Sequence, residues 1–269
     1  MKKDKKALPM YEERIVLLLD ILGFREMIES SAEKTEEIDK IKKAILTIRE
    51  VFDIAQTTHE RTITQFSDSI VVSFLISEKG EVAFLLSKTH KLIKTLIAQE
   101  IMCRGAITKG NMIHDENFMF GPAFIEAYSL EIKVANYPRI ILIDESIIEI
   151  GVEYHGYHPA DDPSYEKSEI NSFITKDFDG FYFVDYFNVE TIWEISDVDK
   201  QYVKDLRSLI IEGLKKHKDQ PDIIQKYEWM RSKYNNLVIN LKEDNRVEVA
   251  GFTLGSNKTD LFYQGLTQI

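Results

Sequence analysis

The stretch "VLLLDILGFREMIE", residues 16–29, places one carboxylate inside an apolar run. Apolar residues lie on both sides of Asp20, and together they predict a buried strand over residues 14–21. A lone carboxylate at the end of such a strand is costly unless it is paired or binds a metal. The group that pairs with the Asp20 carboxylate therefore indicates the function of this end of the strand.

Composition limits the classes of protein to consider. The 269 residues allow one large domain, or one domain with an appendage. The net charge of -11 argues against a general nucleic-acid binder. Cys103 is the single cysteine, so no internal disulfide forms, which fits a reducing compartment. No apolar run is long enough to span a bilayer, and no signal peptide is evident. We therefore expect a cytoplasmic protein that binds neither nucleic acid nor membrane.

The hydrophobic pattern predicts alternating strands and helices along the chain. A tight turn at Ser67-Asp68-Ser69 predicts a hairpin within residues 61–74. The polar segment 151–178 is expected to be an exposed excursion. Helices are expected at residues 24–57, 80–99, 120–131 and from about 197 onward, and further strands at residues 102–110, 139–143 and 180–187.

The first six elements follow the order β-α-β-β-α-β, which is typical of the ferredoxin-like arrangement. In that arrangement the first strand lies antiparallel beside the third. Asp20 ends the first strand, and Asp68 immediately precedes the third. The topology therefore predicts that these two carboxylates meet at one edge of the sheet.

Two adjacent carboxylates repel each other unless a cation or a shared proton relieves them. A pair of divalent metal ions that assists phosphoryl transfer is a common solution. In the following loop, Gly23 allows the backbone to approach a triphosphate, and Phe24 begins a helix, where anions are stabilised. The alternative is that Asp20 caps this helix and Asp68 is an ordinary turn residue. For either residue alone that alternative is preferred, but for the two together we favour the metal site.

Four segments resemble motifs of the class III nucleotidyl cyclases. "LLLDILGFREMIE" is similar to their first metal motif, and "QFSDSIVVSF" to their second. "RGAITKGNM" resembles their Arg-x-Gly-Ile-x-x-Gly strand, and "FGPAFIEAYSLE" the helix on their dimer face. The resemblance covers residues 14–145. It implies an α+β, ferredoxin-like βαββαβ class III cyclase fold with a helical C-terminal extension. The expected domains are residues 1–195 and 196–269.

The resemblance also implies roles for individual residues. Asp20 and Asp68 would bind two divalent ions, Mg²⁺ or Mn²⁺, through their side chains. Ile21 would bind metal through its carbonyl, and Gly23 and Phe24 would hold phosphates. The sites would lie between the two chains of a homodimer. The positions that contact the base correspond to Thr64 and Phe118, which lack the usual purine-reading pairs.

Within this family, "EAYSLEIKVANYPRIIL" is similar to the stand-alone pyrimidine cyclases of bacterial Pycsar systems. That likeness implies conversion of UTP or CTP to a 3′,5′-cyclic nucleotide and pyrophosphate. The product would be a second messenger in anti-phage defence.

The chain departs from the family on the dimer-face helix. Many members carry an Asn and an Arg four residues apart, where this chain has Ile125 and Ser129. Lys133, Arg139 and Arg104 are the candidates to supply the missing cation. A catalytically degenerate nucleotide sensor therefore remains an alternative. A diguanylate cyclase or a polymerase palm ranks below it, because the Gly-Gly-Asp/Glu-Glu-Phe hairpin is absent.

Overall fold

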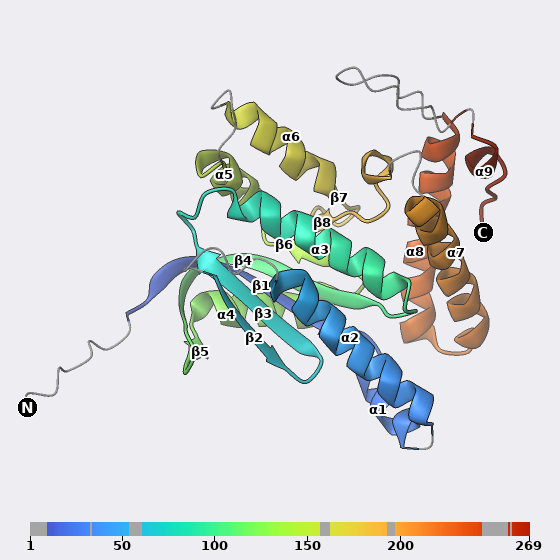
Figure 1. The fold of residues 1–269 in the computed structure, drawn as a ribbon, viewed down its shortest axis with the longest axis horizontal. Helices are drawn as coiled ribbons and strands as arrows, with labels where there is room; N and C mark the ends of the chain where they lie inside the picture. Colours follow the sequence, from blue (N-terminus) through green and yellow to red (C-terminus); the bar gives the residue numbers. More distant parts are fainter. Residues whose placement is uncertain are drawn as a thin grey trace, which may run out of the picture.

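The strand pairing of the protein follows the expected ferredoxin-like order (Figure 1). The computed structural model describes residues 10–32, 34–53, 61–156, 162–192, 197–243, 258 and 260–269. Across these residues one sheet has the order β2-β3-β1-β4-β6-β8-β7, with β5 paired to β4. The strands are β1 (Glu12–Ile21), β2 (Thr62–Phe66), β3 (Ser69–Leu75), β4 (Cys103–His114), β5 (Met119–Phe120), β6 (Ile140–Leu142), β7 (Ile174–Lys176) and β8 (Tyr182–Val184).

The helices lie on both faces of this sheet. They are α1 (Phe24–Ser31), α2 (Thr35–Asp53), α3 (Glu81–Ile97), α4 (Pro122–Lys133), α5 (Ser146–Glu153), α6 (Pro163–Phe173), α7 (Asp197–Lys216), α8 (Pro221–Glu243) and α9 (Leu261–Gln264). Within the described residues, no helix combines the length and the hydropathy needed to cross a membrane.

The first four strands confirm the α+β, ferredoxin-like prediction. β1 is antiparallel to both β3 and β4, and β2 forms a hairpin with β3. In this register the Cα of Asp20 pairs with Ser69 on one side and with Arg104 on the other. The chain crossings therefore place the end of β1 between the start of β3 and the start of β4.

Side chains along β1 point alternately to the two faces of the sheet and pack in two separate apolar layers. Ile15, Leu17 and Leu19 belong to the large core that includes residues of α2 and α3. Val16 and Leu18 face the other way and pack with the small residues of α4. We call this second side the α4 face. Asp20 lies two residues beyond Leu18, so its side chain emerges on the α4 face.

α7 and α8 form a helical pair beside the end of the sheet (Figure 1). Their buried side chains join the same hydrophobic core as α3 and the sheet. Lys94 of α3 is paired with Asp199 of α7, with 2.7 Å between Nζ and Oδ1. The expected domain boundary at residues 195–196 lies outside the described residues and stays a prediction.

Three expected elements differ from the structure. The helix expected over 24–57 is divided into α1 and α2, and residues 54–57 lie outside the described residues. β4 continues four residues beyond Gly110, where the strand was expected to end. The interpretation of 151–178 as an exposed excursion is wrong. This segment contains α6 and β7. Ile170 and Glu166 are buried on one side of α6, which is otherwise polar.

Candidate active site

The structure brings Asp20 and Asp68 together at the end of β1. The backbone N–H of Ile21 donates to the carbonyl of Asp68 at 3.3 Å. The Ser69 hydroxyl donates to Oδ1 of Asp20 at 2.9 Å. Ser67 adopts a left-handed φ of 53° in the turn, a conformation that L-residues rarely adopt. The backbone thus ties the two aspartates into one local unit.

The charged form of Asp20 is disfavoured in this unit. Burial raises the pKa of Asp20 to about 6, and the hydrogen bond from Ser69 opposes that rise. The charges of Asp68 and Glu131 raise the pKa further, while Arg104 lowers it. Several carboxylates at this partly buried end of β1 repel one another, and a bound cation would reduce that repulsion.

Glu131 is a site residue that the sequence motifs did not identify. It follows Ala123 and Ala127 at steps of four along the buried side of α4. Its Oε1 lies 2.6 Å from Nε of Arg104. Burial raises the pKa of Glu131, although Arg104 lowers it. The sequence signal that could have identified Glu131 is a charged residue in line with the small apolar residues on the buried side of this helix.

The donor set fits a divalent ion that also binds its substrate. Across the described ranges, no group of three or more His, Cys, Asp or Glu side chains converges as a metal cage would. Mg²⁺ commonly uses one or two carboxylates together with substrate phosphates. Asp20 and Asp68, with the carbonyl of Ile21 beside them, match that smaller requirement.

The loop after β1 does not use Asp20 as a helix cap. Gly23 itself occupies the N-cap position of α1, with a left-handed φ of 77° and no side-chain hydrogen bond. Phe24 is the first residue of α1, and the backbone N–H of Leu22 donates to the carbonyl of Met102 at 2.9 Å. The capping alternative for Asp20 is therefore wrong.

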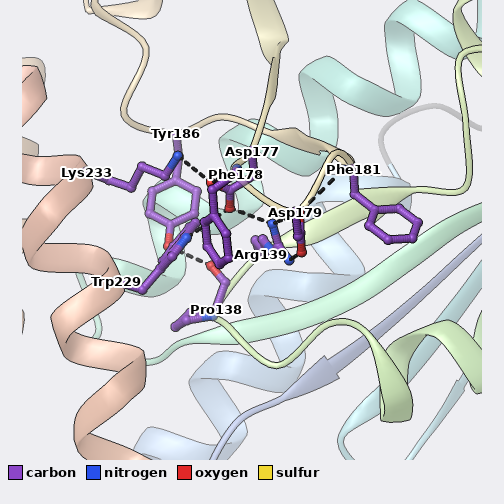
Figure 2. A network of polar contacts seen from close by, with 9 residues as sticks. All are labelled: Pro138, Arg139, Asp177, Phe178, Asp179, Phe181, Tyr186, Trp229 and Lys233. Carbon is purple, nitrogen blue, oxygen red and sulfur yellow. Dashed lines mark hydrogen bonds and ion pairs between the residues drawn. The ribbon is translucent and has the colours of Figure 1, made fainter.

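The three candidate cations lie in different surroundings. Arg104 is 24% exposed and lies beside Asp20 in the sheet register. Lys133 is exposed at the end of α4 and has no ion pair with another described residue. Arg139 is fully buried, and its guanidinium is paired with Asp177 and Asp179 (Figure 2). The structure therefore does not bring Arg139 to the site.

Thr64 ends a chain of buried polar contacts. Nε of Arg14 donates to Oγ of Ser73 at 2.9 Å. Oγ of Ser73 lies 2.8 Å from Nδ1 of His114, and Nε2 of His114 lies 2.9 Å from Oγ1 of Thr64. In the His114 tautomer that is protonated at Nε2, Ser73 Oγ donates to Nδ1 and Nε2 donates to Oγ1 of Thr64. The Thr64 hydroxyl then has its own hydrogen available for an acceptor.

The other expected contact positions lie on exposed surfaces. Phe118 is 51% exposed and follows β4, four residues after His114. On α4, Ile125 is exposed and Ser129 is half-buried. Ile125, Tyr128 and Ile132 form an exposed apolar stripe at helical spacing. The outer side of α4 therefore presents contact surface rather than a positioned Arg.

The thiol of Cys103 is not a nucleophile in this site. Burial raises the pKa of Cys103 to about 12, and the charge of Asp20 adds to that effect. Thiolate is the reactive form of cysteine, so this side chain stays protonated and inert.

No family model matches the chain, and no curated protein matches it. Solved structures do align with it. A bacterial light-regulated adenylyl cyclase is 11% identical, with a TM-score of 0.42, over 54% of this chain and 46% of that chain. The adenylyl cyclase CyaB from P. aeruginosa is 16% identical, with a TM-score of 0.45, over 66% of this chain and 96% of that chain.

A third similar structure is the guanylate cyclase domain of RhGC from Catenaria anguillulae in complex with GTP. It is 14% identical, with a TM-score of 0.41, over 53% of this chain and 84% of that chain. The chain spans less than half of the light-regulated cyclase that it matches.

Proposed function

We propose that the chain is a nucleotidyl cyclase that converts a nucleoside triphosphate to a 3′,5′-cyclic nucleotide and pyrophosphate. The observation that carries this proposal is the pairing of Asp20 with Ser69, which sets Asp20 and Asp68 side by side. A carboxylate pair of this kind suits divalent ions that bind together with a triphosphate. The motifs around both aspartates add the resemblance to class III cyclases.

Each nearby residue has a distinct role in this proposal. Asp20, Asp68 and the carbonyl of Ile21 hold the divalent ions. When bound, such ions lower the pKa of the ribose 3′-hydroxyl and neutralise the leaving pyrophosphate. Gly23 and Phe24 place backbone N–H groups against the phosphates at the start of α1. Lys133, exposed on the same helix as Glu131, stabilises charge on the α-phosphate.

The pyrimidines UTP and CTP are the proposed substrates. With His114 protonated at Nε2, the contact chain leaves the Thr64 hydroxyl as a hydrogen-bond donor. Uracil and cytosine both offer the acceptor O2, and uracil also offers O4. The exposed ring of Phe118 provides a surface on which a base can stack. A product of this kind would serve as a second messenger, with anti-phage defence as the proposed setting.

The proposed enzyme is a homodimer with sites between the chains. Ile125, Tyr128 and Ile132 expose apolar surface along one side of α4. A second copy of the chain would bury that stripe, as isologous interfaces do. The partner's α4 would then bring its own Lys133 toward the first chain's aspartates.

Mass spectrometry of reactions with each of the four nucleoside triphosphates tests this proposal. We expect a cyclic pyrimidine nucleotide from the wild type with Mn²⁺ or Mg²⁺. Asp20→Asn and Asp68→Asn should give no product, because each removes a charged metal ligand while keeping the side-chain shape. A cyclic purine product would overturn the base assignment alone.

A nucleotide sensor without catalytic activity is the second candidate. The observation that favours it is Ile125, which is exposed and apolar at a position where many cyclases carry a polar residue. Nucleotide binding by the wild type without any cyclic product would support this candidate over the enzyme.

A further inference from the structure

A hollow of about 360 Å³ lies between α2 and the β2-β3 hairpin (Figure 1). Small-molecule sites begin at about 300 Å³, so the hollow has room for one small compound. Ile70 in its wall belongs to the large core, on the opposite side of the sheet from the α4 face. The two elements line the hollow with Leu46, Arg49, Glu50, Ile63, Gln65 and Ile70.

Gln65 is a polar residue on the core-facing side of β2. It lies two residues after Ile63 and pairs across the hairpin with Ile70, which is fully buried. Both Oε1 and Nε2 of its amide are shielded from solvent, and neither has a hydrogen-bond partner among the described residues. An unpaired buried donor or acceptor is costly. The amide therefore lacks a partner that a ligand could supply.

Gln99 shows how a glutamine serves the packing of α2. Its Nε2 donates to Oγ1 of Thr47 at 3.0 Å, which ties the end of α3 to α2, although its Oε1 has no partner in the described part of the chain. Gln65 makes neither kind of contact. Attachment of α2 to the sheet therefore does not explain why an amide is placed in the wall of the hollow.

α2 contributes one stripe of side chains to the hollow. Leu46, Arg49 and Glu50 are three and four residues apart and therefore share a helix face. Arg49 and Glu50 are exposed, and neither is ion-paired with another described residue. Their opposite charges cancel, which favours an uncharged ligand over a polyanion. The aliphatic side chains beside them offer walls for a flat ring.

We propose that this hollow is a second binding site, separate from the metal edge, for an uncharged nucleoside. The amide of glutamine pairs with a base edge that offers a donor and an acceptor in one plane. Proteins also hold unpaired bases between apolar side chains. The ribose hydroxyls would donate to Glu50. Because the amide is shielded in this structure, binding includes a rotation of the Gln65 side chain into the hollow.

The proposed site lies on the other face of β2 from Thr64. Thr64 pairs with Val71, which packs on the α4 face, whereas Gln65 pairs with Ile70 of the large core. A nucleoside in the hollow and a base at Thr64 would thus occupy opposite sides of one strand. This separation allows the two sites to be tested independently.

Calorimetric titration of the protein in EDTA with adenosine, guanosine, cytidine and uridine tests the site. We expect at least one nucleoside to bind, and Gln65→Leu to weaken its binding by about 10-fold or more, because two hydrogen bonds are lost. Gln99→Leu is the matched control, because it removes the same amide outside the hollow, and it should keep the affinity.

Thermal unfolding gives a second readout that separates a ligand-binding amide from a structural one. Gln65→Leu should raise the midpoint by about 2 °C or more, because an apolar group replaces an unpaired buried amide. Gln99→Leu should lower the midpoint, because its hydrogen bond to Thr47 is lost. A lower midpoint for Gln65→Leu would show that the amide stabilises the fold and would overturn the inference.

The binding outcomes also separate this site from the proposed enzyme. The inference is overturned if no nucleoside binds, if Gln65→Leu binds normally, or if Gln99→Leu loses as much affinity. Thr64→Val should bind the nucleoside normally, and an equal loss there would place the ligand at the proposed catalytic site instead. Binding through Gln65 by a chain that gives no cyclic nucleotide would uphold this site and overturn the cyclase.

Discussion

At the scale of single residues, the central feature is a carboxylate in a place that disfavours its charge. Asp20 has a pKa raised to about 6, first by burial and then by Asp68 and Glu131. The native state thus keeps this proton to a higher pH than the unfolded chain does. Between about pH 4 and 6 the contribution of Asp20 to stability therefore falls as pH rises. The proposed metal-binding role, rather than stability, would account for a charge held in this way.

Asp20→Asn should consequently stabilise the metal-free protein at neutral pH. Asn retains the acceptor for Ser69 and removes the charge. We expect a gain of about 1–2 kcal/mol at pH 7.5, allowing for solvent screening of a partly buried group. The gain should shrink toward pH 4, where Asp20 is protonated in the native state and partly protonated in the unfolded chain. Urea unfolding in EDTA at both pH values measures it, and an equal effect at the two would contradict the raised pKa.

His114 should have the opposite pH dependence. Burial lowers the pKa of His114 to about 4, and the charge of Arg14 contributes to this. The unfolded chain binds a proton at His114 near pH 6.5, whereas the native state does not until about pH 4. The contribution of neutral His114 to the free energy of unfolding is therefore present above pH 6.5 and is lost as pH falls toward 4. We expect the wild type to lose up to about 2–3 kcal/mol more than His114→Gln between pH 7 and pH 4. Equal losses in urea titrations would refute this assignment.

At the scale of elements, the sequence predicted what local patterns encode. The apolar run before Asp20 and the turn at Ser67 specified β1 and the β2-β3 hairpin, so the meeting of two aspartates followed from topology alone. The partner of Glu131 and the burial of Arg139 depend on side chains from distant segments. Arg139 is paired with Asp177 and Asp179, rather than with nearer acids along the chain, because loop 177–181 folds back toward β6. No periodicity encodes such a contact.

The link between α8 and the sheet should depend strongly on Asp177, whose carboxylate accepts from Trp229 and Lys233 of α8 (Figure 2). Asp177→Asn weakens the more buried of the two acidic partners of Arg139, and Asp177→Ala removes it and leaves Asp179 as the remaining partner. Breaking a buried ion pair by removing one partner typically costs about 3–5 kcal/mol, and the remaining pair with Asp179 reduces this cost. Asp179→Ala is the control, because its carboxylate is 26% exposed and water can replace it. Thermal unfolding should give a much larger loss for Asp177→Ala than for Asp179→Ala, and similar losses would show that the buried pair is not what fastens α8.

At the scale of the whole molecule, α4 packs one side against β1 and exposes the apolar stripe of Ile125, Tyr128 and Ile132 on the other. Lys133 and the stripe belong to one helix, whereas Asp20 and Asp68 lie at the edge of the sheet. In the proposed dimer, a site shared between two chains would account for a contact surface beside the proposed metal ligands. Dimer assembly is therefore part of the proposed mechanism. The sequence alone indicated a dimer only through its resemblance to the class III cyclases.

Ile125→Asp should disrupt the proposed dimer while leaving the chain folded. The side chain is 68% exposed, so the substitution adds charge to the stripe without touching the core. Sedimentation should show a monomer, and turnover should be lost. Glu126→Gln, on the exposed neighbouring position, is the control and should remain dimeric. A monomeric variant with full turnover would exclude a shared site.

Complementation tests which chain supplies Lys133. Asp20→Asn and Lys133→Gln should each be inactive alone. If the aspartates of one chain act with the lysine of its partner, a mixed dimer contains one intact site. Equal mixing should then restore up to about a quarter of wild-type activity. No recovery from a mixture shown to exchange subunits would place Lys133 outside the partner's site.

The most direct test of the metal assignment is Mn²⁺ binding followed by electron paramagnetic resonance, in the presence of a nucleoside triphosphate. The wild type should bind Mn²⁺ together with the nucleotide, whether it is an enzyme or a sensor. Asp20→Asn and Asp68→Asn should each abolish that binding, because the two carboxylates act as one donor set. Normal Mn²⁺ binding by either variant would contradict the metal site on which the proposed function rests.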